Sequence, residues 1–220
     1  MTVYRGGLMS LFVVDHPLVA HRITVLRDEH TPSPVFRRAV AEIATLLAYE
    51  ATRTLHVDSV TVRTPTGLEA PGHRMPAPGP LLVPVLRAGL GLLDGFLSVL
   101  PEAEVGMIGL RRNEETFEPE QYAEKLPKSL KGRDVYVLDP MLATGGSLAF
   151  TCQLLLDRGA ETVTAVSVIS APEGVARVRA ACPSVRIVTA ALDPGLNERA
   201  FIVPGLGDAG DRLFGTSTSA

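Results

Sequence analysis

The segment VYVLDPMLATGGS, Val135 to Ser147, joins an apolar strand to a glycine-rich turn and the start of a helix. The strand places Asp139 at its carboxyl end. Glycine amides can approach an anion closely, the hydroxyls of Thr144 and Ser147 add hydrogen-bond donors, and a helix N-terminus adds partial positive charge. The segment therefore predicts a phosphate site in which Asp139 accepts hydrogen bonds from sugar hydroxyls.

This turn lacks the lysine of a nucleoside triphosphate site. In the pattern GxxxxGK[ST] that lysine reaches the β- and γ-phosphates, whereas Gly146 is followed here by Ser147 and Leu148. The turn is therefore expected to bind a single phosphate group. A second interpretation is a purely structural turn, in which Gly145 and Gly146 only allow the chain to bend. The carboxylate at the strand end favours the phosphate site.

Short apolar strands alternate with helical stretches on both sides of this segment. The alternation predicts an α/β fold with a parallel sheet, helices on both faces and ligands at the carboxyl ends of the strands. Strands are expected at residues 81–86, 104–110, 134–138, 163–169 and 185–190, and helices up to Leu100, from Ser147 and from Pro172.

The N-terminal part of the chain has a different pattern, with two helices in succession. The first begins at Pro17, and His16 is expected to help start it. The second has Ser33 as its expected N-cap, because apolar residues then recur every three or four positions. Short strands are expected at Leu11–Val14 and Val57–Arg63, and a loop or hairpin at 70–80.

A length of 220 residues fits one domain. Its expected parts are an arm and hairpin at 1–80, a core at 81–190 and a glycine-rich end at 191–220. Two segments interrupt the alternation, the polar stretch Arg111–Arg133 and the tail from Asp193. Both are expected to be loops that close over a ligand.

The composition excludes several classes of protein. Hydrophobic residues make up 46% of the chain and the mean hydropathy is +0.22, which suits a folded core. A net charge of −3 and a pI near 6.0 lack the positive field that holds nucleic acid. Cys152 and Cys182 form no disulfide or metal pattern and no export signal is expected, so a cytoplasmic protein is favoured. The apolar stretch 81–100 contains Arg87 and Asp94, which disfavour a membrane span.

The segment PVLRAGLGLLDG, Pro84–Gly95, imitates a dinucleotide-binding fingerprint because glycines follow a strand. The acidic residue expected to bind a ribose after the next strand is absent, and Arg111 and Arg112 stand there instead. Arg87 lies at the tip of its strand, where a guanidinium can bind diphosphate oxygens with two hydrogen bonds. The alternative for Arg87 is a structural role, as an ion pair with Asp94 or as a partner of a helix terminus.

Several motifs together resemble a known family. LDPMLATGGS resembles the donor-binding motif of the type I phosphoribosyltransferases, and other segments narrow the resemblance to the uracil phosphoribosyltransferases. They are PVLRAGLGLLDG, RRNEET (Arg111–Thr116), APEG (Ala171–Gly174) and LNERAFIVPGLGDAGDRLFGT (Leu196–Thr216), with HPLVAHRITVLRDE (His16–Glu29) and YEAT (Tyr49–Thr52) in the arm. The resemblance covers almost the whole chain.

The resemblance implies a type I phosphoribosyltransferase core with an N-terminal helical arm and a C-terminal glycine-rich hood that binds the base. The implied reaction transfers ribose 5-phosphate from 5-phosphoribosyl 1-diphosphate to uracil, giving UMP and diphosphate in pyrimidine salvage. The implied catalytic residues are Asp208 and Arg112, which lies on a loop expected to close. The donor is expected to contact Arg87, Arg112, Asp139, Pro140, Met141, Leu142, Ala143, Thr144, Gly145, Gly146, Ser147 and Asp208, and uracil to contact Ile202, Gly207, Asp208 and Ala209.

The glycines from Gly205 to Gly215 hold the backbone in an irregular course, so its N–H and C=O groups can read the edge of a flat heterocycle. Uracil presents an acceptor, a donor and an acceptor along one edge. Backbone groups of fixed polarity would reject cytosine, because its different edge leaves buried partners unpaired. The alternative is a tail whose glycines only make turns.

A magnesium ion is the implied cofactor, held largely by the donor's own oxygens. The usual adjacent acidic pair of the superfamily is here Asp139-Pro140, so no metal site of protein ligands is expected. A GTP effector and a homo-oligomer, dimer or tetramer, are also implied. Two other functions stay open: a non-catalytic sensor of the donor or of a nucleotide, and an enzyme of the same fold that uses another nucleobase, such as a purine.

Overall fold

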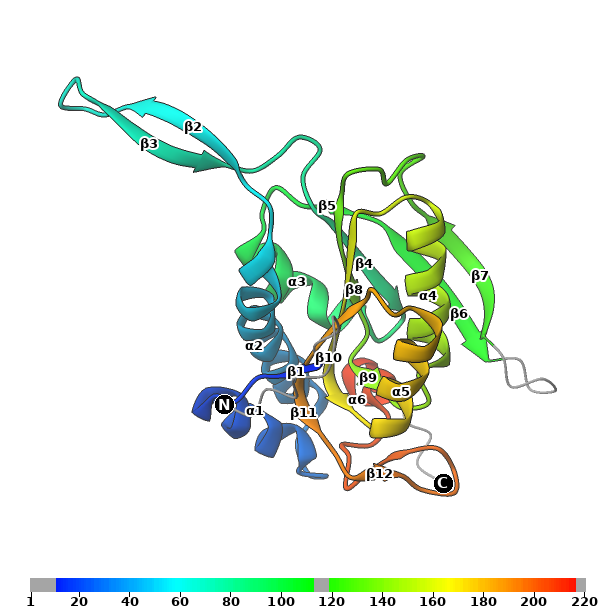
Figure 1. Cartoon of the computed structure of the whole chain (residues 1–220). Helices are drawn as coiled ribbons and strands as arrows, with labels where there is room; N and C mark the ends of the chain where they lie inside the picture. Colours follow the sequence, from blue (N-terminus) through cyan, green and yellow to red (C-terminus); the bar gives the residue numbers. More distant parts are fainter. Residues whose placement is uncertain (1–10, 113–118, 217–220) are drawn as a thin grey trace.

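The computed structural model describes residues 11–112 and 119–216 of the chain (Figure 1). Its main sheet has the strand order β1-β11-β10-β8-β4-β6-β7, and the short strands β5 and β9 pair with β4 and β10. The strands are β1 Leu11–Val13, β4 Leu81–Leu86, β5 Glu104–Val105, β6 Met107–Arg112, β7 Pro119–Lys125, β8 Asp134–Leu138, β9 Met141–Leu142, β10 Thr162–Ser170 and β11 Arg186–Leu192. The predicted α/β fold is confirmed.

The edge strand β7 corrects one prediction. Among the described strands of the main sheet, every pairing is parallel except that of β6 with β7. The expectation that the whole of Arg111–Arg133 is a loop is therefore wrong, since β7 lies within it. An edge strand faces water and can be polar without losing its hydrogen bonds to β6, so its composition resembles that of a loop.

Alternate residues of the central strands face two separate cores. In β8, Tyr136 and Leu138 pack in the core that contains the helices α1 Pro17–Arg27, α2 Ser33–Ala51 and α3 Leu90–Val99. Val135 and Val137 pack in the other core, with α4 Gly146–Asp157 and α5 Pro172–Ala181. Figure 1 shows α2 and α3 on one side of the sheet and α4 and α5 on the other. Because both faces are covered, the strand is apolar after its first residue, Asp134.

The two N-terminal helices begin in different ways. His16 is the N-cap of α1, and its Nδ1 accepts a hydrogen bond from the Leu18 amide at 3.1 Å, as predicted. The prediction of Ser33 as N-cap of α2 is wrong, because Ser33 is already helical and Pro32 is the N-cap. The Pro32 carbonyl accepts the Phe36 amide at 3.0 Å, so the backbone closes the first turn without a side-chain cap.

A hairpin projects from the body of the molecule between the arm and the core (Figure 1). After the short 3₁₀ helix Thr52–Thr54, β2 Asp58–Arg63 pairs antiparallel with β3 Glu69–Arg74. Its turn contains Gly67, whose φ of +85° suits glycine. Of the predicted range 70–80, residues 70–74 belong to the hairpin and residues 75–80 form the loop that leads to β4.

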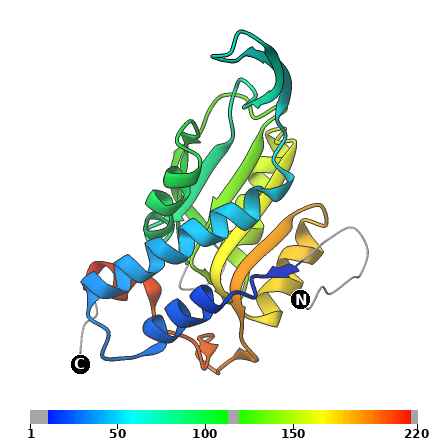
Figure 2. The same ribbon diagram turned by 90° about the vertical axis from the view of Figure 1, so that its left-hand side faces the viewer.

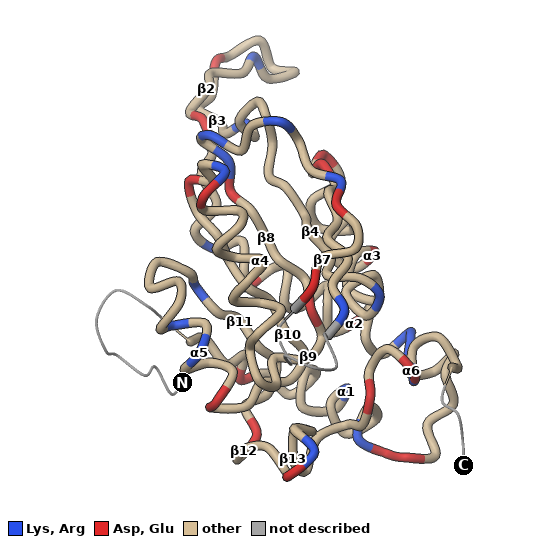
Figure 3. The backbone as a smooth tube through the Cα atoms, turned by 90° about the vertical axis from the view of Figure 1, so that its right-hand side faces the viewer, with Lys and Arg blue, Asp and Glu red and all other residues tan. Residues whose placement is uncertain are grey.

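The apolar stretch 81–100 divides into β4 and α3. It is therefore an inner strand and a covering helix, as expected. No helix among residues 11–112 and 119–216 combines the length and the apolar character needed to cross a membrane. Figure 3 shows residues of both charge signs spread along the described chain.

The tail from Asp193, which was expected to be a loop, instead forms a small hairpin and a short helix. They are β12 Gly195–Leu196, which pairs antiparallel with β13 Ile202–Val203, and α6 Ala209–Phe214. Helix α6 packs against α2, and Figure 2 shows it beside the beginning of that helix. The tail therefore returns to the N-terminal arm and lies next to the carboxyl ends of the central strands.

Candidate active site

A cavity of about 460 Å³ opens at the carboxyl ends of β4 and β8. This volume lies in the usual range for a small-molecule site. It is lined by Arg87 and Ala88 after β4, by Asp139 and Met141–Leu148 after β8, and by Arg199–Ile202 and Gly207–Gly210 in the tail. The fold thus brings the predicted phosphate loop, residues 139–147, and the predicted hood into one cavity.

The phosphate loop is held by the strand and helix beside it. Strand β9 pairs with the end of β10, and the Ala171 amide donates to the Leu142 carbonyl at 2.9 Å. Gly145 has a φ of +79° and is the N-cap of α4. Since Gly145, Gly146 and Ser147 line the cavity, the helix N-terminus with its unpaired amides borders the space where an anion would bind.

Pro140 differs from the other predicted donor contacts of this loop. It is buried and is not among the residues that line the cavity. Its carbonyl accepts hydrogen bonds from the amides of Val168 and Ile169 at 3.0 and 3.1 Å. Pro140 therefore fastens the phosphate loop to β10.

Position 145 requires glycine because it packs against the backbone of α5, and not only because a phosphate approaches it closely. A Cβ on Gly145 would lie 2.6 Å from the carbonyl oxygen of Gly174 in α5. A Cβ on Gly174 would in turn lie 2.4 Å from the Ala143 carbonyl oxygen. Backbone therefore packs directly on backbone where α5 supports the phosphate loop.

Asp139 lines the cavity at the carboxyl end of β8. Burial raises the pKa of its carboxyl to about 7, because desolvation disfavours the charged form. The Met141 amide, which donates to its Oδ1 at 3.3 Å, opposes this effect only weakly. Asp139 therefore titrates near neutral pH, and hydroxyl groups that donate to it would favour its ionised form.

Arg87 reaches the cavity from the end of β4, after a cis peptide bond with Leu86. Its guanidinium lies 3.9 Å from Asp211 and 5.7 Å from the centre of the Phe214 ring. The acidic neighbour is thus Asp211, not the Asp94 considered from the sequence. The Arg87 side chain is 59% exposed, so this pair contributes little to stability and leaves the cation accessible to a ligand.

Arg111 and Arg112 stand at the end of β6. Arg111 forms an exposed ion pair with Glu120 of β7 at 3.0 Å. The Arg112 side chain and residues 113–118, where a closing loop was expected, lie outside the described part of the chain. The role of Arg112 as a clamp stays a prediction.

The hood places its four predicted base contacts on the cavity wall: Ile202, Gly207, Asp208 and Ala209. Gly205 and Gly207 have φ values of +67° and +77°, which glycine adopts readily. Asp208 is the N-cap of α6, and its Oδ1 accepts the Asp211 amide at 2.9 Å. This bond fixes the orientation of the Asp208 carboxylate on the wall.

A buried carboxylate joins the hood to the N-terminal arm. Asp193 accepts hydrogen bonds from Arg27 Nη1 at 2.9 Å and from the Gly205 amide at 2.8 Å. Arg27 also donates to the Gly205 carbonyl at 2.8 Å. Burial alone would raise the pKa of Asp193, but the hydrogen bonds from Arg27 and Gly205 outweigh it and lower that pKa.

Arg212 makes a second connection between the hood and the arm. It donates to the carbonyl oxygens of Leu206 at 2.8 Å, Asp28 at 2.6 Å and Leu26. Its guanidinium carbon lies 4.3 Å from the centre of the Phe36 ring. The arm thus fixes the backbone of the hood from outside the cavity.

Some lining residues were not predicted from the sequence: Arg199, Ala200, Phe201, Ala88, Leu148 and Gly210. The first three lie on the turn between β12 and β13, where the Asn197 side chain accepts the amides of Arg199 and Phe201 at 3.0 Å each. Ala200 has a φ of +62°, which is unusual for a residue other than glycine. An asparagine followed by polar residues is a turn signal, but it does not reveal that the turn faces the cavity.

Comparisons with known proteins show the family of this chain. The family model of uracil phosphoribosyltransferase matches residues 13–216. The chain belongs to the uracil phosphoribosyltransferase family. A uracil phosphoribosyltransferase from Nocardioides sp. is 56% identical over 211 residues, which cover 94% of this chain and 99% of that relative. One from Streptomyces griseus is 55% identical over 212 residues, covering 95% and 100%.

Solved structures place this uracil phosphoribosyltransferase family member in the type I fold. The AQ2163 protein from Aquifex aeolicus superposes with a TM-score of 0.88 at 38% identity, covering 94% of this chain and 99% of that chain. The adenine phosphoribosyltransferase from Trypanosoma brucei, solved with AMP, pyrophosphate and ribose-5-phosphate, has a TM-score of 0.57 at 14% identity and covers 91% and 90%. The second likeness concerns the fold alone. The resemblance and the fold class predicted from the sequence are confirmed.

Proposed function

We propose that this chain transfers ribose 5-phosphate from 5-phosphoribosyl 1-diphosphate to N1 of uracil, forming UMP and diphosphate in pyrimidine salvage. The observation that carries the proposal is the single cavity that the phosphate loop and the hood share. A ribose 5-phosphate unit anchored on the loop would point its C1 toward a base held by the hood. Positioning of this kind can replace a protein nucleophile.

The loop residues Ala143–Ser147 would bind the 5′-phosphate of the donor. Their backbone amides and the hydroxyls of Thr144 and Ser147 supply donors, and the N-terminus of α4 adds partial positive charge. The Asp139 carboxylate would accept hydrogen bonds from the ribose hydroxyls. Together these contacts would hold the sugar on the floor of the cavity.

Arg87 would stabilise the leaving diphosphate. As the bond from C1 to the diphosphate breaks, negative charge grows on the leaving group and positive charge on the ribose ring, while the bond from C1 to N1 of uracil forms. Arg112 would add a second cation when its loop closes. Asp208, the N-cap of α6 on the cavity wall, would accept the N1 proton.

The hood would recognise uracil through its backbone. Ile202, Gly207 and Ala209 line the cavity, and their main-chain groups of fixed polarity would face the base. A base with a different pattern of donors and acceptors would leave these groups unpaired, which is costly in a buried site. This is the basis for expecting uracil to be preferred over cytosine.

A magnesium ion carried by the donor fits the residues present. The described residues contain no cluster of three or more His, Cys, Asp or Glu able to hold a metal ion, and the carboxylates on the cavity wall are Asp139 and Asp208. Magnesium commonly keeps its waters and substrate phosphates and takes only one or two protein carboxylates. Bound in this way, it would neutralise diphosphate charge beside Arg87.

A homo-oligomer, a GTP effector and a cytoplasmic location are further parts of the proposal. Exposed apolar side chains on α1 and α2, namely Leu18, Val35 and Tyr49, and the projecting hairpin β2–β3 favour association of copies. The buried free thiols of Cys152 and Cys182 suit a reducing compartment. The GTP effector rests on the family resemblance, and an assay of turnover with and without GTP tests it.

Diphosphate release measured across a panel of nucleobases tests the proposed reaction. We expect release with the donor and uracil, and release with cytosine lower by about 100-fold or more. Equal release with a purine would make the chain an enzyme for another base, and donor binding without release with any base would make it a sensor. Arg87→Ala should lower kcat/KM by about 100-fold, whereas the matched variant Arg63→Ala on the projecting hairpin should not.

A further inference from the structure

Helix α5 contacts both halves of the cavity wall, although its own residues do not line the cavity. Its first turn belongs to the APEG motif, Ala171–Gly174. The Glu173 side chain accepts a hydrogen bond from the Leu196 amide at 3.2 Å. Leu196 lies in β12, which pairs with β13, so Glu173 holds the base hairpin, residues 195–203, whose turn and second strand line the cavity.

Gly195 brings the base hairpin close to this carboxylate. A Cβ on Gly195 would lie 3.1 Å from Oε1 of Glu173, which is tighter than an ordinary contact. A side chain at position 195 would therefore require the Glu173 carboxylate or the hairpin to shift by a few tenths of an ångström, which disturbs their contact. The contact between the hairpin and Glu173 therefore depends on both partners: position 195 has no side chain, and the Glu173 carboxylate supplies the hydrogen-bond acceptor.

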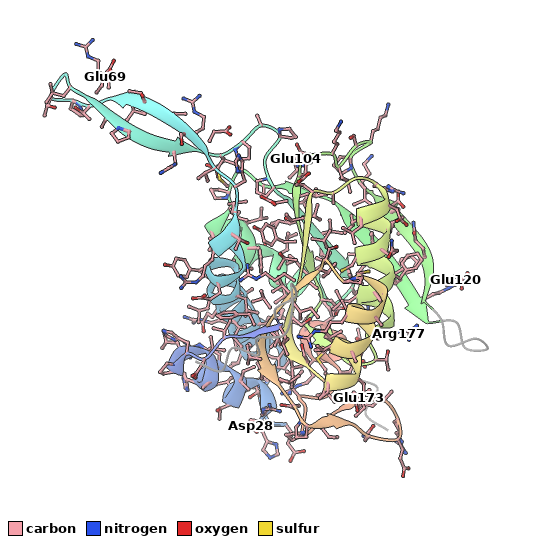
Figure 4. All side chains as sticks on the ribbon, in the orientation of Figure 1. Asp28, Glu69, Glu104, Glu120, Glu173 and Arg177 are labelled. Atoms are coloured by element: carbon pink, nitrogen blue, oxygen red, sulfur yellow. The ribbon has the colours of Figure 1, made fainter. Side chains whose placement is uncertain are left out.

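Helix α5 also supports the phosphate loop, through Gly174 and Arg177. Gly174 packs against the carbonyl oxygens of Ala143 and Leu142, at 2.4 and 2.8 Å from its ideal Cβ position. The guanidinium of Arg177 lies 3.3 Å from where a Cβ of Gly146 would stand. In Figure 4, Glu173 lies at the end of α5 nearest the β12 segment, and Arg177 lies further along the helix.

We propose that Glu173 is a positioning residue for the base half of the site. By holding Leu196, it sets the distance between the base hairpin and the phosphate loop, because both rest on the rigid first turns of α5. The inference depends on the function proposed above, since it assigns the hairpin to uracil. Loss of the contact should loosen the uracil site and leave the donor site intact.

A different role for this carboxylate is stabilisation of α5. A negative charge in the first turn of a helix favours the helix through its dipole, and that role requires the charge. Holding the hairpin requires only an acceptor oxygen. Glu173→Gln keeps an acceptor and removes the charge, whereas Glu173→Ala removes both, so the two variants separate the roles.

Steady-state kinetics of the full chain with uracil as the varied substrate test the proposal. For Glu173→Ala we expect KM for uracil to rise about three- to tenfold, with kcat at saturating uracil and calorimetric Kd for the donor unchanged. Glu173→Gln should behave like the unmodified chain. An unchanged KM in the Ala variant, an equal loss of donor affinity, or a Gln variant as impaired as the Ala variant would each overturn it.

A second variant covers the case in which Glu173→Ala does not fold. Gly195→Ala leaves α5 unaltered and crowds the same contact, so it should also raise KM for uracil without changing donor affinity, and an unchanged KM would overturn the proposal. Failure of the proposed function is distinguishable, because the unmodified chain would then show no uracil-dependent release. The same variants would in that case be assayed with the base that the chain accepts.

Discussion

Asp139 illustrates how a single residue acquires its chemistry from the end of a strand. It follows the apolar run of β8, and Pro140 and Met141 fix the backbone after it by pairing with β10. The resulting burial raises its pKa to about 7. The sequence predicts the position of this carboxylate, whereas its titration near neutral pH depends on the surrounding packing.

Donor binding should strengthen as pH rises through the pKa of Asp139, because the ribose hydroxyls donate to the ionised form. With a pKa of about 7, the ionised fraction grows about tenfold between pH 6 and pH 8, and the donor affinity should follow it. Calorimetry at both pH values measures this change. In Asp139→Asn, the only pH dependence of donor affinity that should remain is the part caused by titration of the donor's own phosphates. If the variant kept the pH dependence of the unmodified chain, Asp139 would not be the group that binds the ribose hydroxyls.

Asp139→Asn should stabilise the unliganded protein, although it weakens donor binding. Because the folded-state pKa of Asp139 is raised, the folded protein binds its proton more tightly than the unfolded chain does, and stability is lost as pH rises from about 4 to about 7. Asp139→Asn should therefore raise Tm of the unliganded protein at pH 8 and weaken the donor. A gain of stability with a loss of binding is typical of a residue kept for function.

At the scale of elements, the turn from β4 into α3 depends on one glycine. Gly89 is the N-cap of α3, and a Cβ there would lie 2.3 Å from the Leu138 carbonyl oxygen and 2.6 Å from the backbone of Val85. Strands β4 and β8 can therefore end side by side only if position 89 has no side chain. This contact brings Arg87 and Asp139 to one cavity.

Gly89→Ala should destabilise the fold by about 1 to 3 kcal/mol, because overpacking against backbone forces the strand end to shift. Donor affinity should fall as well. Gly72→Ala in the projecting hairpin is the matched control, since its Cβ would meet only Val60 and Val62 side chains at 3.6 Å or more. Denaturant midpoints measure the difference, and equal midpoints for the two variants would contradict this account of Gly89.

At the scale of the whole molecule, the first and last parts of the chain combine to build the hood. Arg27 of α1 binds Asp193 and the Gly205 backbone, and Arg212 of α6 returns to carbonyl groups at the end of α1. The Asp193 side chain is only 5% exposed. Removing Asp193 leaves the Arg27 guanidinium, which is 28% exposed, without its acidic partner, so the pair should affect both stability and the base site.

Asp193→Asn should lower the free energy of unfolding by about 1 to 2 kcal/mol at neutral pH, less than for a fully buried pair because Arg27 is partly exposed. The pKa of Asp193 is lowered in the folded state, so its contribution is present above the unfolded value of 3.8 and is lost as pH falls through the folded one. The stability difference between the two proteins should therefore narrow below about pH 4. Glu120→Gln, in an exposed pair with Arg111, should leave stability unchanged.

The sequence by itself determined the local elements and the phosphate loop. Apolar runs covered on both faces, the Asp139 strand end and Gly145-Gly146 carry enough signal within a few neighbouring residues to predict β8, α4 and an anion site. The edge strand β7 escaped prediction because its exposed faces permit polar residues, so its pairing with β6 leaves no apolar pattern.

Only the tertiary structure decided how the distant parts meet. The turn at Arg199–Phe201 lines the cavity, and Glu173 contacts the base hairpin. Arg27 supports the hood through Asp193, which lies 166 positions further along the chain. These contacts depend on backbone directions and on glycines that admit neighbouring backbone. Local sequence patterns encode neither, because each contact becomes favourable only when both partners are already folded.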